Sequence, residues 1–240
     1  NTAVSELNHA RVFSDTKDVI YIKPSINERG EMKNSMSYGK LPELKGIEGD
    51  VSYPRNFKRS NEYFYLNDKE LVYPWEAVAY DDGSLFYECS TRPLTYRKMF
   101  CWGTHKGGTK WQKFLSHDDD ERYVEIQAGI FPTQLHSDVL KANSDVEFMQ
   151  IFGLKYVDEC KMPYGSYDKA RGYIQNIIYT EKWNTDIKKH EIDMKKMALL
   201  PVKKVLSNGR GWGALELKRA KKDHDTLSLC SMYFPLDSMD

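Results

Sequence analysis

Short segments of alternating or continuous apolar residues recur over the first two thirds of the chain. They lie at residues 10–13, 19–22, 63–66, 75–80, 85–90, 98–102, 123–128 and 146–152. Turn residues separate them, and the DDG sequence at residues 81–83 is typical of a tight hairpin. Many short strands with turns between them predict an antiparallel β-sandwich or barrel. Residues 26–62, which contain several Gly and Pro, predict a long loop.

The pattern changes to helical spacing after Pro163, where apolar residues recur every three or four positions. Helices are predicted at residues 167–183, 185–200 and 213–222. We therefore expect a mainly β fold followed by a C-terminal helical segment. The predicted domains are a β domain over residues 1–160 and a helical extension over residues 161–240.

Charge and hydropathy exclude several classes of partner. The chain has 35 basic and 35 acidic residues, so its formal net charge is zero. This balance offers no basic surface to nucleic acid or to an anionic membrane. No apolar run approaches the roughly 18 residues that a membrane-spanning helix needs, and no signal peptide opens the sequence. Neither a nucleic acid nor a membrane is expected as a partner.

The four cysteines, Cys89, Cys101, Cys160 and Cys230, show no C-x-x-C spacing and no cluster with histidine. Zinc and redox motifs are therefore not indicated. Free thiols in a reducing compartment are the better interpretation, which favours a cytoplasmic location. The sequence contains no motif for a cofactor or a metal ion.

Aromatic residues are abundant, with 16 Tyr, 10 Phe and 5 Trp. Tyrosine and tryptophan combine a flat apolar face with a polar tip, which suits stacking against sugar rings. The same residues also fill the cores of β domains. Three tryptophans near the predicted strands are candidates for either role: Trp75, Trp102 and Trp111.

The segment at residues 123–128 shows the cleanest alternation in the chain. It places Tyr123, Glu125 and Gln127 on one face of a strand. A carboxylate between two hydrogen-bonding side chains can hold sugar hydroxyls or act as an acid or base. The alternative is a solvated sheet face that carries a surface glutamate.

Two histidines lie near these candidates in the sequence. His105 lies in a Gly-containing loop, and it can exchange protons near neutral pH or be part of a surface turn. Gln134 and His136 follow the strand that carries Glu125, and they could line the same groove or bond to a loop. The acidic residues 117–121 favour a solvated hairpin loop over a cation site.

Several segments occur together in an order that is specific. They are NTAVSE at residues 1–6, DVSY at 50–53, RKMFCWG at 97–103, WQKFL at 111–115, YVEIQAG at 123–129 with Thr133 and Gln134, and GWGALE at 211–216. With these segments the chain resembles an uncharacterised bacterial family whose domain is similar to galactose mutarotase. Many members of that family carry tetratricopeptide-like helical repeats further along the chain.

The resemblance implies a β-supersandwich that binds a sugar in a cleft on one sheet. Mutarotases pair a glutamate base with a histidine acid, and Glu125 matches the setting of that base. His105 or His136 would be the acid, and Arg97 would be a further binding residue. The mutarotase motif N-H-x-Y-F is not found, and residues 1–4 stand near its place without a histidine. We also expect the chain to begin within a supersandwich whose first half lies upstream.

Three functions follow as hypotheses. The first is a carbohydrate-binding, mutarotase-like domain of a larger protein, with its ligand held by aromatic rings, Glu125 and Gln127. The second is an aldose epimerase or a glycoside-processing enzyme with Glu125 as the base. The third is a protein-interaction scaffold in which the helices join a partner or downstream helical repeats.

Overall fold

The computed structural model describes residues 1–7, 9–116, 122–158, 161–181, 186–198, 200, 203–204 and 211–224. The chain divides into two compact units, Asn1–Thr180 and Glu181–Asp240. The sequence places a boundary at residue 160, and the structure divides the chain after Thr180. The difference arises because the first C-terminal helix packs on the β-sheets and so belongs to the first unit.

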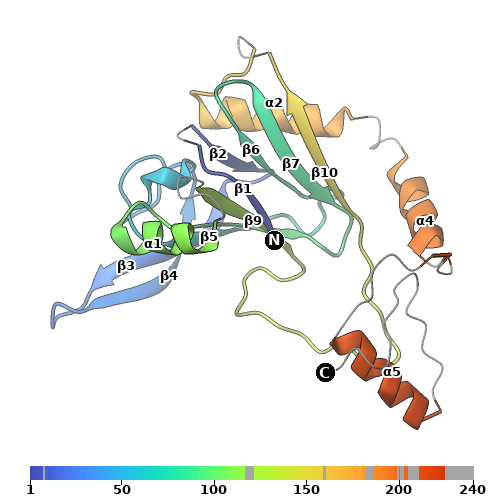
Figure 1. The fold of residues 1–240 in the computed structure, drawn as a ribbon. Coiled ribbons are helices and arrows are strands. Elements are labelled where there is room, and N and C mark those ends of the chain that lie inside the picture. Colours follow the sequence, from blue (N-terminus) through green and yellow to red (C-terminus); the bar gives the residue numbers. More distant parts are fainter. Residues whose placement is uncertain are drawn as a thin grey trace. The chain divides into compact units, whose positions relative to one another are not determined.

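The first unit contains two antiparallel sheets (Figure 1). The six-stranded sheet has the order β1 (Thr2–Ser5), β9 (Tyr123–Gly129), β8 (Tyr96–Cys101), β5 (Asn61–Tyr65), β3 (Asp18–Ile26) and β4 (Met32–Lys40). The four-stranded sheet has the order β10 (Gln150–Tyr156), β7 (Ser84–Ser90), β6 (Trp75–Ala79) and β2 (Arg11–Ser14). The predicted mainly β architecture with helices after it is confirmed.

The two sheets face each other through alternating side chains of their central strands. Arg97 of β8 reaches Glu88 of β7, with 2.6 Å between Nε and Oε2. Met99, two residues further along β8, is also fully buried, as are Tyr63 of β5 and Ile126 of β9. These side chains form the core between the sheets, because residues two apart on a strand lie on the same face.

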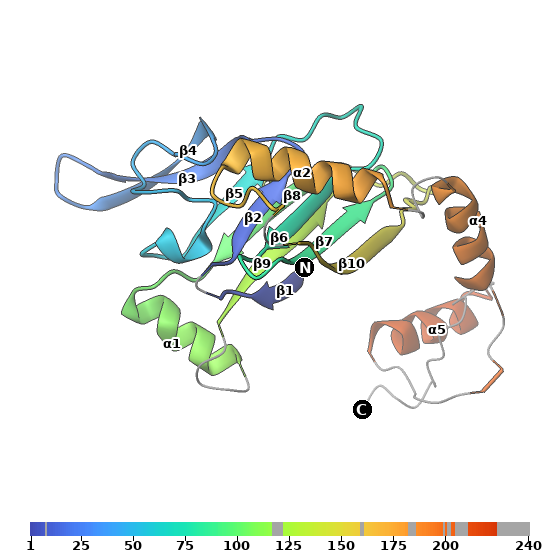
Figure 2. The same cartoon turned by 90° about the horizontal axis from the view of Figure 1, so that it is seen from above.

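Helix α2 (Tyr167–Tyr179) packs across the four-stranded sheet, on the side away from the six-stranded sheet (Figure 2). Tyr167 stacks on Phe13 of β2 with 5.1 Å between ring centroids. Its buried residues Ala170, Ile174 and Ile178 follow the predicted helical spacing. The helix thereby gives the four-stranded sheet its second apolar layer, and both faces of β6 are buried.

The prediction of a long loop at residues 26–62 is wrong in part. β3 and β4 form a hairpin whose turn is closed by a hydrogen bond from the Asn27 amide to the Glu31 carbonyl at 2.9 Å. β4 carries polar and exposed residues along most of its length, so no apolar alternation marks it. Its cross-strand backbone bonds to β3 hold it in the sheet. The short 3-10 helix Pro54–Asn56 lies in the remaining connection.

Helix α1 (Lys106–Leu115) also replaces a predicted loop. Gly107 and Gly108 lower the helix propensity of the segment, so the sequence pattern does not predict this helix. Gly108 is required by packing, because a Cβ atom there would lie 2.0 Å from the carbonyl oxygen of Trp102. The predicted acidic loop at residues 117–121 lies outside the described residues.

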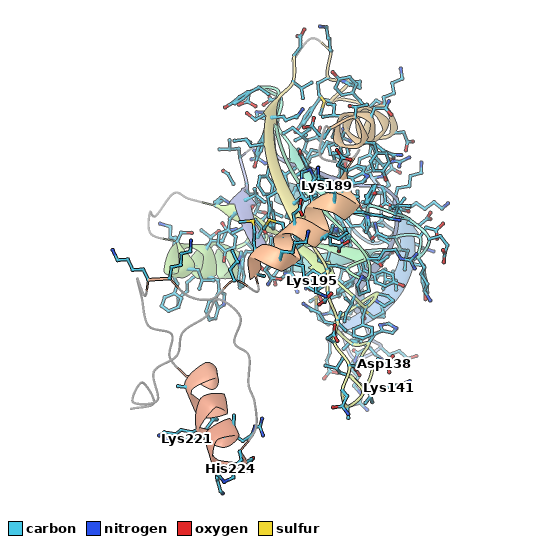
Figure 3. The ribbon with its side chains drawn as sticks, turned by 90° about the vertical axis from the view of Figure 1, so that its right-hand side faces the viewer. Asp138, Lys141, Lys189, Lys195, Lys221 and His224 are labelled. Carbon is cyan, nitrogen blue, oxygen red and sulfur yellow. The ribbon has the colours of Figure 1, made fainter. Side chains whose placement is uncertain are left out.

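Between β9 and β10, residues 130–149 form a connection without helix or strand. Its first part folds back beside the six-stranded sheet. Asp138 and Lys141 lie on its outlying part (Figure 3). This connection is the element that closes one end of the site described below.

The second unit contains two described helices, α4 (Ile187–Ala198) and α5 (Trp212–Lys222). They match the predicted helices at residues 185–200 and 213–222 within a few residues at each end. Lys189 and Lys195 lie on α4 (Figure 3). None of the helices in the described part of the chain is long and apolar enough to cross a membrane.

Candidate functional site

One face of the six-stranded sheet points away from the four-stranded sheet, and we call it the outer face. On β8, Arg97 points into the sandwich, so Lys98 and Phe100 point outward. Phe100 lies in register between Glu125 of β9 and Glu62 of β5. Lys98 lies in register between Gln127 of β9 and Phe64 of β5. Six side chains in two adjacent rows therefore form the centre of the outer face.

An ion pair joins the two rows. The Nζ atom of Lys98 lies 2.5 Å from Oε2 of Glu62. The same Nζ atom lies 5.2 Å from the ring centroid of Phe64 and 5.7 Å from that of Phe100. Lys98 is only 7% exposed, so the carboxylate and the two rings together compensate its lost hydration. The amine is thus fixed in place and neutralised on the sheet.

A chain of amide and carboxylate groups runs beside this ion pair. Gln127 donates its Nε2 to Oε2 of Glu125 at 3.0 Å. Gln134 donates its Nε2 to Oε1 of Gln127 at 3.5 Å, and Asn1 donates its Nδ2 to Glu125 at 3.5 Å. The Gln127 amide is therefore held in one orientation. The structure brings Glu125, Gln127 and Gln134 together, as their positions in the sequence suggest.

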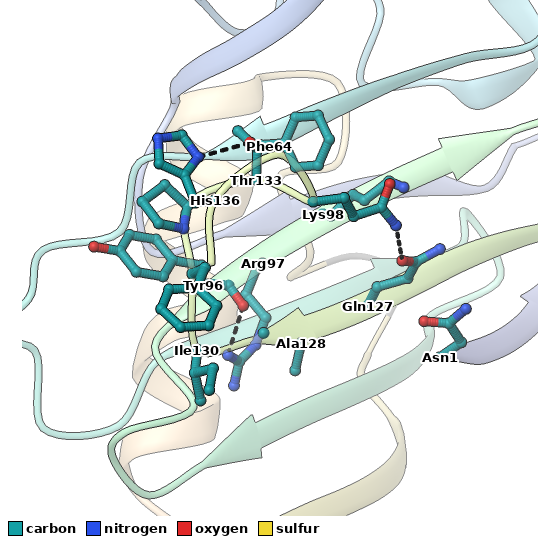
Figure 4. Close-up of a pocket in the computed structure, with 14 residues that line it drawn as sticks. Asn1, Phe64, Tyr96, Arg97, Lys98, Gln127, Ala128, Ile130, Thr133 and His136 are labelled. Carbon is teal, nitrogen blue, oxygen red and sulfur yellow. Dashed lines mark hydrogen bonds between the residues drawn. The ribbon is translucent and has the colours of Figure 1, made fainter. Parts of the chain in front are cut away.

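The first cavity on this face has a volume of about 320 Å³ (Figure 4). Its lining residues include Phe64, Tyr96, Lys98, Gln127, Gln134 and His136. The connection after β9 forms one wall, where Oγ1 of Thr133 lies 2.8 Å from Nδ1 of His136. Phe64 and Tyr96 are 4% and 8% exposed, so they offer a small apolar area beside the oriented amides. Such a combination is suited to a ligand with an apolar face and hydroxyl groups.

Two further cavities open on the same face. The second has a volume of about 600 Å³, and its lining includes Met32, Asn34, Asn61, Glu62, Phe100 and His105. The third has a volume of about 620 Å³, and its lining includes Ala3, Ser5, Leu115, Arg122, Tyr123 and Glu125. The outer face is therefore indented at three adjoining places.

The histidines that could serve as an acid lie apart from Glu125. His136 lines the first cavity, His105 lines the second and Glu125 lines the third. The backbone amide of His105 bonds to the carbonyl of Lys58 at 2.8 Å, which places this residue at the start of α1. None of the three cavities has a histidine and Glu125 together among its described lining residues.

The candidate tryptophans differ in their exposure. Trp111 is 54% exposed on α1, and it stacks against Trp102 with 6.0 Å between ring centroids. Trp102 in turn meets the edge of Phe100 at 5.0 Å. Trp111 can therefore offer one ring face to a ligand beside the outer face.

The structure places the side chains of two predicted binding residues in the core. Trp75 is fully buried in β6 beneath α2, where a ligand has no access. Arg97 is 1% exposed, and its guanidinium bonds to Glu88, to Ser90 and to the carbonyl of Pro74. Trp75 therefore serves the core alone, whereas Arg97 serves the core and also lines the first cavity.

Sequence reasoning missed Glu62, Lys98, Phe64 and Phe100. Lys98 and Phe100 alternate with the buried residues of β8, and that alternation marks them as one face. Their partners on β5 could not be found in this way, because strand pairing over this separation leaves no local pattern. In the described part of the chain, no group of three or more His, Cys, Asp or Glu could hold a metal ion.

Behind the outer face, Glu76 of β6 is fully buried, and it accepts a hydrogen bond from the backbone amide of Gln127 at 3.3 Å. Burial raises the pKa of Glu76 well above its ordinary value, although the nearby Arg97 opposes this shift. Burial raises the pKa of Glu88 as well, but Glu88 makes the close ionic contact with Arg97, which opposes that shift. The folded chain therefore holds a proton on Glu76 at pH values where the unfolded chain has lost it.

This proton gives a prediction for stability. The unfolding free energy should fall as the pH rises above the unfolded pKa of about 4.3, because the folded state binds the extra proton. Glu76→Gln keeps the shape without the charge, so we expect it to be more stable than the native protein at pH 8 and its stability to depend less on pH. Urea unfolding at pH 5 and pH 8 measures both effects. Glu70→Gln, at an exposed position, is the control, and a Glu76→Gln protein that is less stable at both pH values would contradict the assignment.

Comparison of the chain with protein-family models, with curated protein sequences and with solved structures found no match. The functional argument therefore depends on the outer face itself. Its features are three adjoining cavities, a fixed Lys98–Glu62 ion pair, oriented amides and aromatic rings.

Proposed function

We propose that residues 1–180 form a carbohydrate-binding domain and that its ligand lies on the outer face of the six-stranded sheet. The observation that carries this proposal is the first cavity, where Gln127 and Gln134 lie beside the rings of Phe64 and Tyr96. A sugar ring has an apolar face that can stack and hydroxyls that bond to amides, so it fits such a surface.

A relationship to galactose mutarotase-like domains is part of this proposal. It is supported by the two-sheet architecture and by the position of Glu125 on an outward-facing strand position. We also propose a cytoplasmic location. The two cysteines in the described part of the chain, Cys89 and Cys101, are free and buried, which suits a reducing compartment.

Binding is proposed in preference to catalysis. An aldose epimerase needs an acid placed across the sugar from its base. Glu125 is bonded to Gln127, and the third cavity that it lines has no histidine among its described residues. Under this proposal, Glu125 orients the amide of Gln127. The alternative is an epimerase or a glycoside-processing enzyme in which Glu125 is the base.

The proposal is tested by calorimetric titration with common mono- and disaccharides. We expect saturable binding, and we expect Gln127→Ala to weaken it by about 3–10-fold, since one hydrogen bond contributes roughly 0.5–1.5 kcal/mol. Gln175→Ala makes the same change on α2, and it should leave the affinity unchanged. Glu125→Gln separates the alternatives, because loss of anomer exchange with retained binding would indicate an epimerase. Absence of binding to every sugar would contradict the proposal.

A protein-interaction scaffold is the second candidate, and one observation favours it. The edge strand β10 exposes a row of large apolar side chains on one face: Phe152, Leu154 and Tyr156. Such a row on an edge strand is typical of a surface that another chain covers. Self-association that Leu154→Lys abolishes would favour this candidate.

A further inference from the structure

The first and second cavities are separated by side chains alone. Lys98 lines the first cavity, while Glu62 and Phe100 line the second. Lys98 and Glu62 form the 2.5 Å ion pair, so the walls of the two cavities touch. No strand or helix lies between them, because both cavities lie over neighbouring strands of one sheet. A ligand that crosses the ion pair can therefore occupy both cavities.

The sizes of the cavities indicate an extended ligand. The first and second cavities have volumes of about 320 Å³ and 600 Å³, and each is in the range of a site for a small molecule. A third cavity of about 620 Å³ adjoins the first through the bond between Gln127 and Glu125. One monosaccharide would fill a single cavity and leave its neighbours to solvent.

The paired lysines in these cavities favour a neutral ligand. Lys98 is paired with Glu62, and Lys58 in the second cavity lies 3.0 Å from Glu48. These lysines are therefore neutralised before any ligand arrives. Arg59 also lines the second cavity and contacts the sulfur of Met32, so its charge is the feature that would favour an acidic ligand and is tested below.

Uncharged amides supply the remaining polar groups. Asn34 and Asn61 line the second cavity, and Gln127 and Gln134 line the first. An amide both donates and accepts hydrogen bonds, as a hydroxyl group does, so a row of amides matches a chain of hydroxyl-bearing rings. Phe100, which is partly exposed and lies 5.7 Å from the Lys98 amine, supplies apolar surface along the row.

We infer that the ligand is a neutral oligosaccharide of at least two sugar units that crosses the Lys98–Glu62 ion pair and fills the first and second cavities together. This inference rests on the proposed carbohydrate-binding function and adds the class of carbohydrate. Binding at two linked places raises the affinity of a chain above that of its single unit, because the second contact is intramolecular.

The test is titration of residues 1–240 with glucose, galactose and their neutral oligomers of two to four units. We expect at least a tenfold gain in affinity between the monosaccharide and the best oligomer. Asn34→Ala in the second cavity and Gln127→Ala in the first should each weaken oligomer binding by about 3–10-fold. A monosaccharide should respond to only one of the two variants.

Matched controls lie on α2, on the far side of the four-stranded sheet. Asn176→Ala and Gln175→Ala make the same chemical changes there, and they should leave every affinity unchanged. Equal affinity for monosaccharide and oligomer, with no effect of Asn34→Ala, would overturn the inference and leave the proposed function standing. Tighter binding of uronic acid oligomers, lost in Arg59→Gln, would overturn the neutral class. No binding of any sugar would overturn both.

Discussion

Replacement of Arg97 by Ala is expected to lower the unfolding free energy by about 3–5 kcal/mol, because it leaves a buried carboxylate without its partner. The Nε atom of Arg97 lies 2.6 Å from Oε2 of Glu88 between the two sheets. The same guanidinium bonds to the carbonyls of Leu94 and Pro74 at 2.9 Å and 2.7 Å. One truncation therefore removes the ionic partner of Glu88 and one hydrogen bond from each of these carbonyls, to which Ser90 still donates.

Urea unfolding followed by circular dichroism measures this loss. Arg92→Ala is the matched control, since Arg92 is partly exposed and lies 3.7 Å from the exposed Glu70. Exposed ion pairs contribute little, so we expect the control to change the unfolding free energy by less than about 1 kcal/mol. Where Arg97→Ala does not fold, Arg97→Lys should fold with intermediate stability, because it keeps the charge and loses the fork of donors. An Arg97→Ala protein of native stability that loses sugar affinity would contradict the core role.

Trp75→Ala should cost about 3–5 kcal/mol of unfolding free energy, as for other large aromatic residues truncated in a core. Trp75 is fully buried in β6, and its neighbours Ala77 and Ala79 are too small to fill the space left behind. α2 covers this side of the strand, so the cavity would weaken the contact between helix and sheet. Thermal unfolding and amide exchange of α2 would measure the effect.

Trp111→Ala is the control for Trp75, and it separates a core tryptophan from a surface one. Trp111 is half exposed on α1, and its stacking on Trp102 contributes about 1 kcal/mol. We expect a small loss of stability in this variant. Any loss of sugar affinity should occur in Trp111→Ala and not in Trp75→Ala. Reversed results for the two tryptophans would contradict the placement of Trp75 in the core.

The fold class could be predicted from the sequence because local alternation carries it. The alternation in β9 places Glu125 and Gln127 outward and Val124 and Ile126 inward, as the structure has them. β4 could not be predicted, since its residues are polar and its place depends on backbone bonds to β3. α1 could not be predicted because Gly107 and Gly108 lower its helix propensity. Gly108 is required by its packing against Trp102.

The site could be predicted only where its residues are close in the sequence. Glu125, Gln127 and Gln134 lie within ten positions of one another, and the structure joins them by hydrogen bonds. Lys98 and Glu62 are far apart in the chain, and their ion pair follows from the pairing of β5 with β8. Trp75 was predicted as a binding residue because a tryptophan that suits sugars also suits a β core. Arg97 is buried because it pairs with Glu88 across the two sheets, and such a contact leaves no local pattern in the sequence.

The central claim, that carbohydrate binds on the outer face of the six-stranded sheet, is tested most directly by mapping the bound sugar. A ¹H–¹⁵N titration of the labelled chain with neutral oligosaccharides would show which amides shift. The account predicts shifts at Phe64, Lys98, Gln127 and Gln134, with the amides of α2 unchanged. Shifts confined to α2 or to β10, or no shift at millimolar sugar, would contradict it.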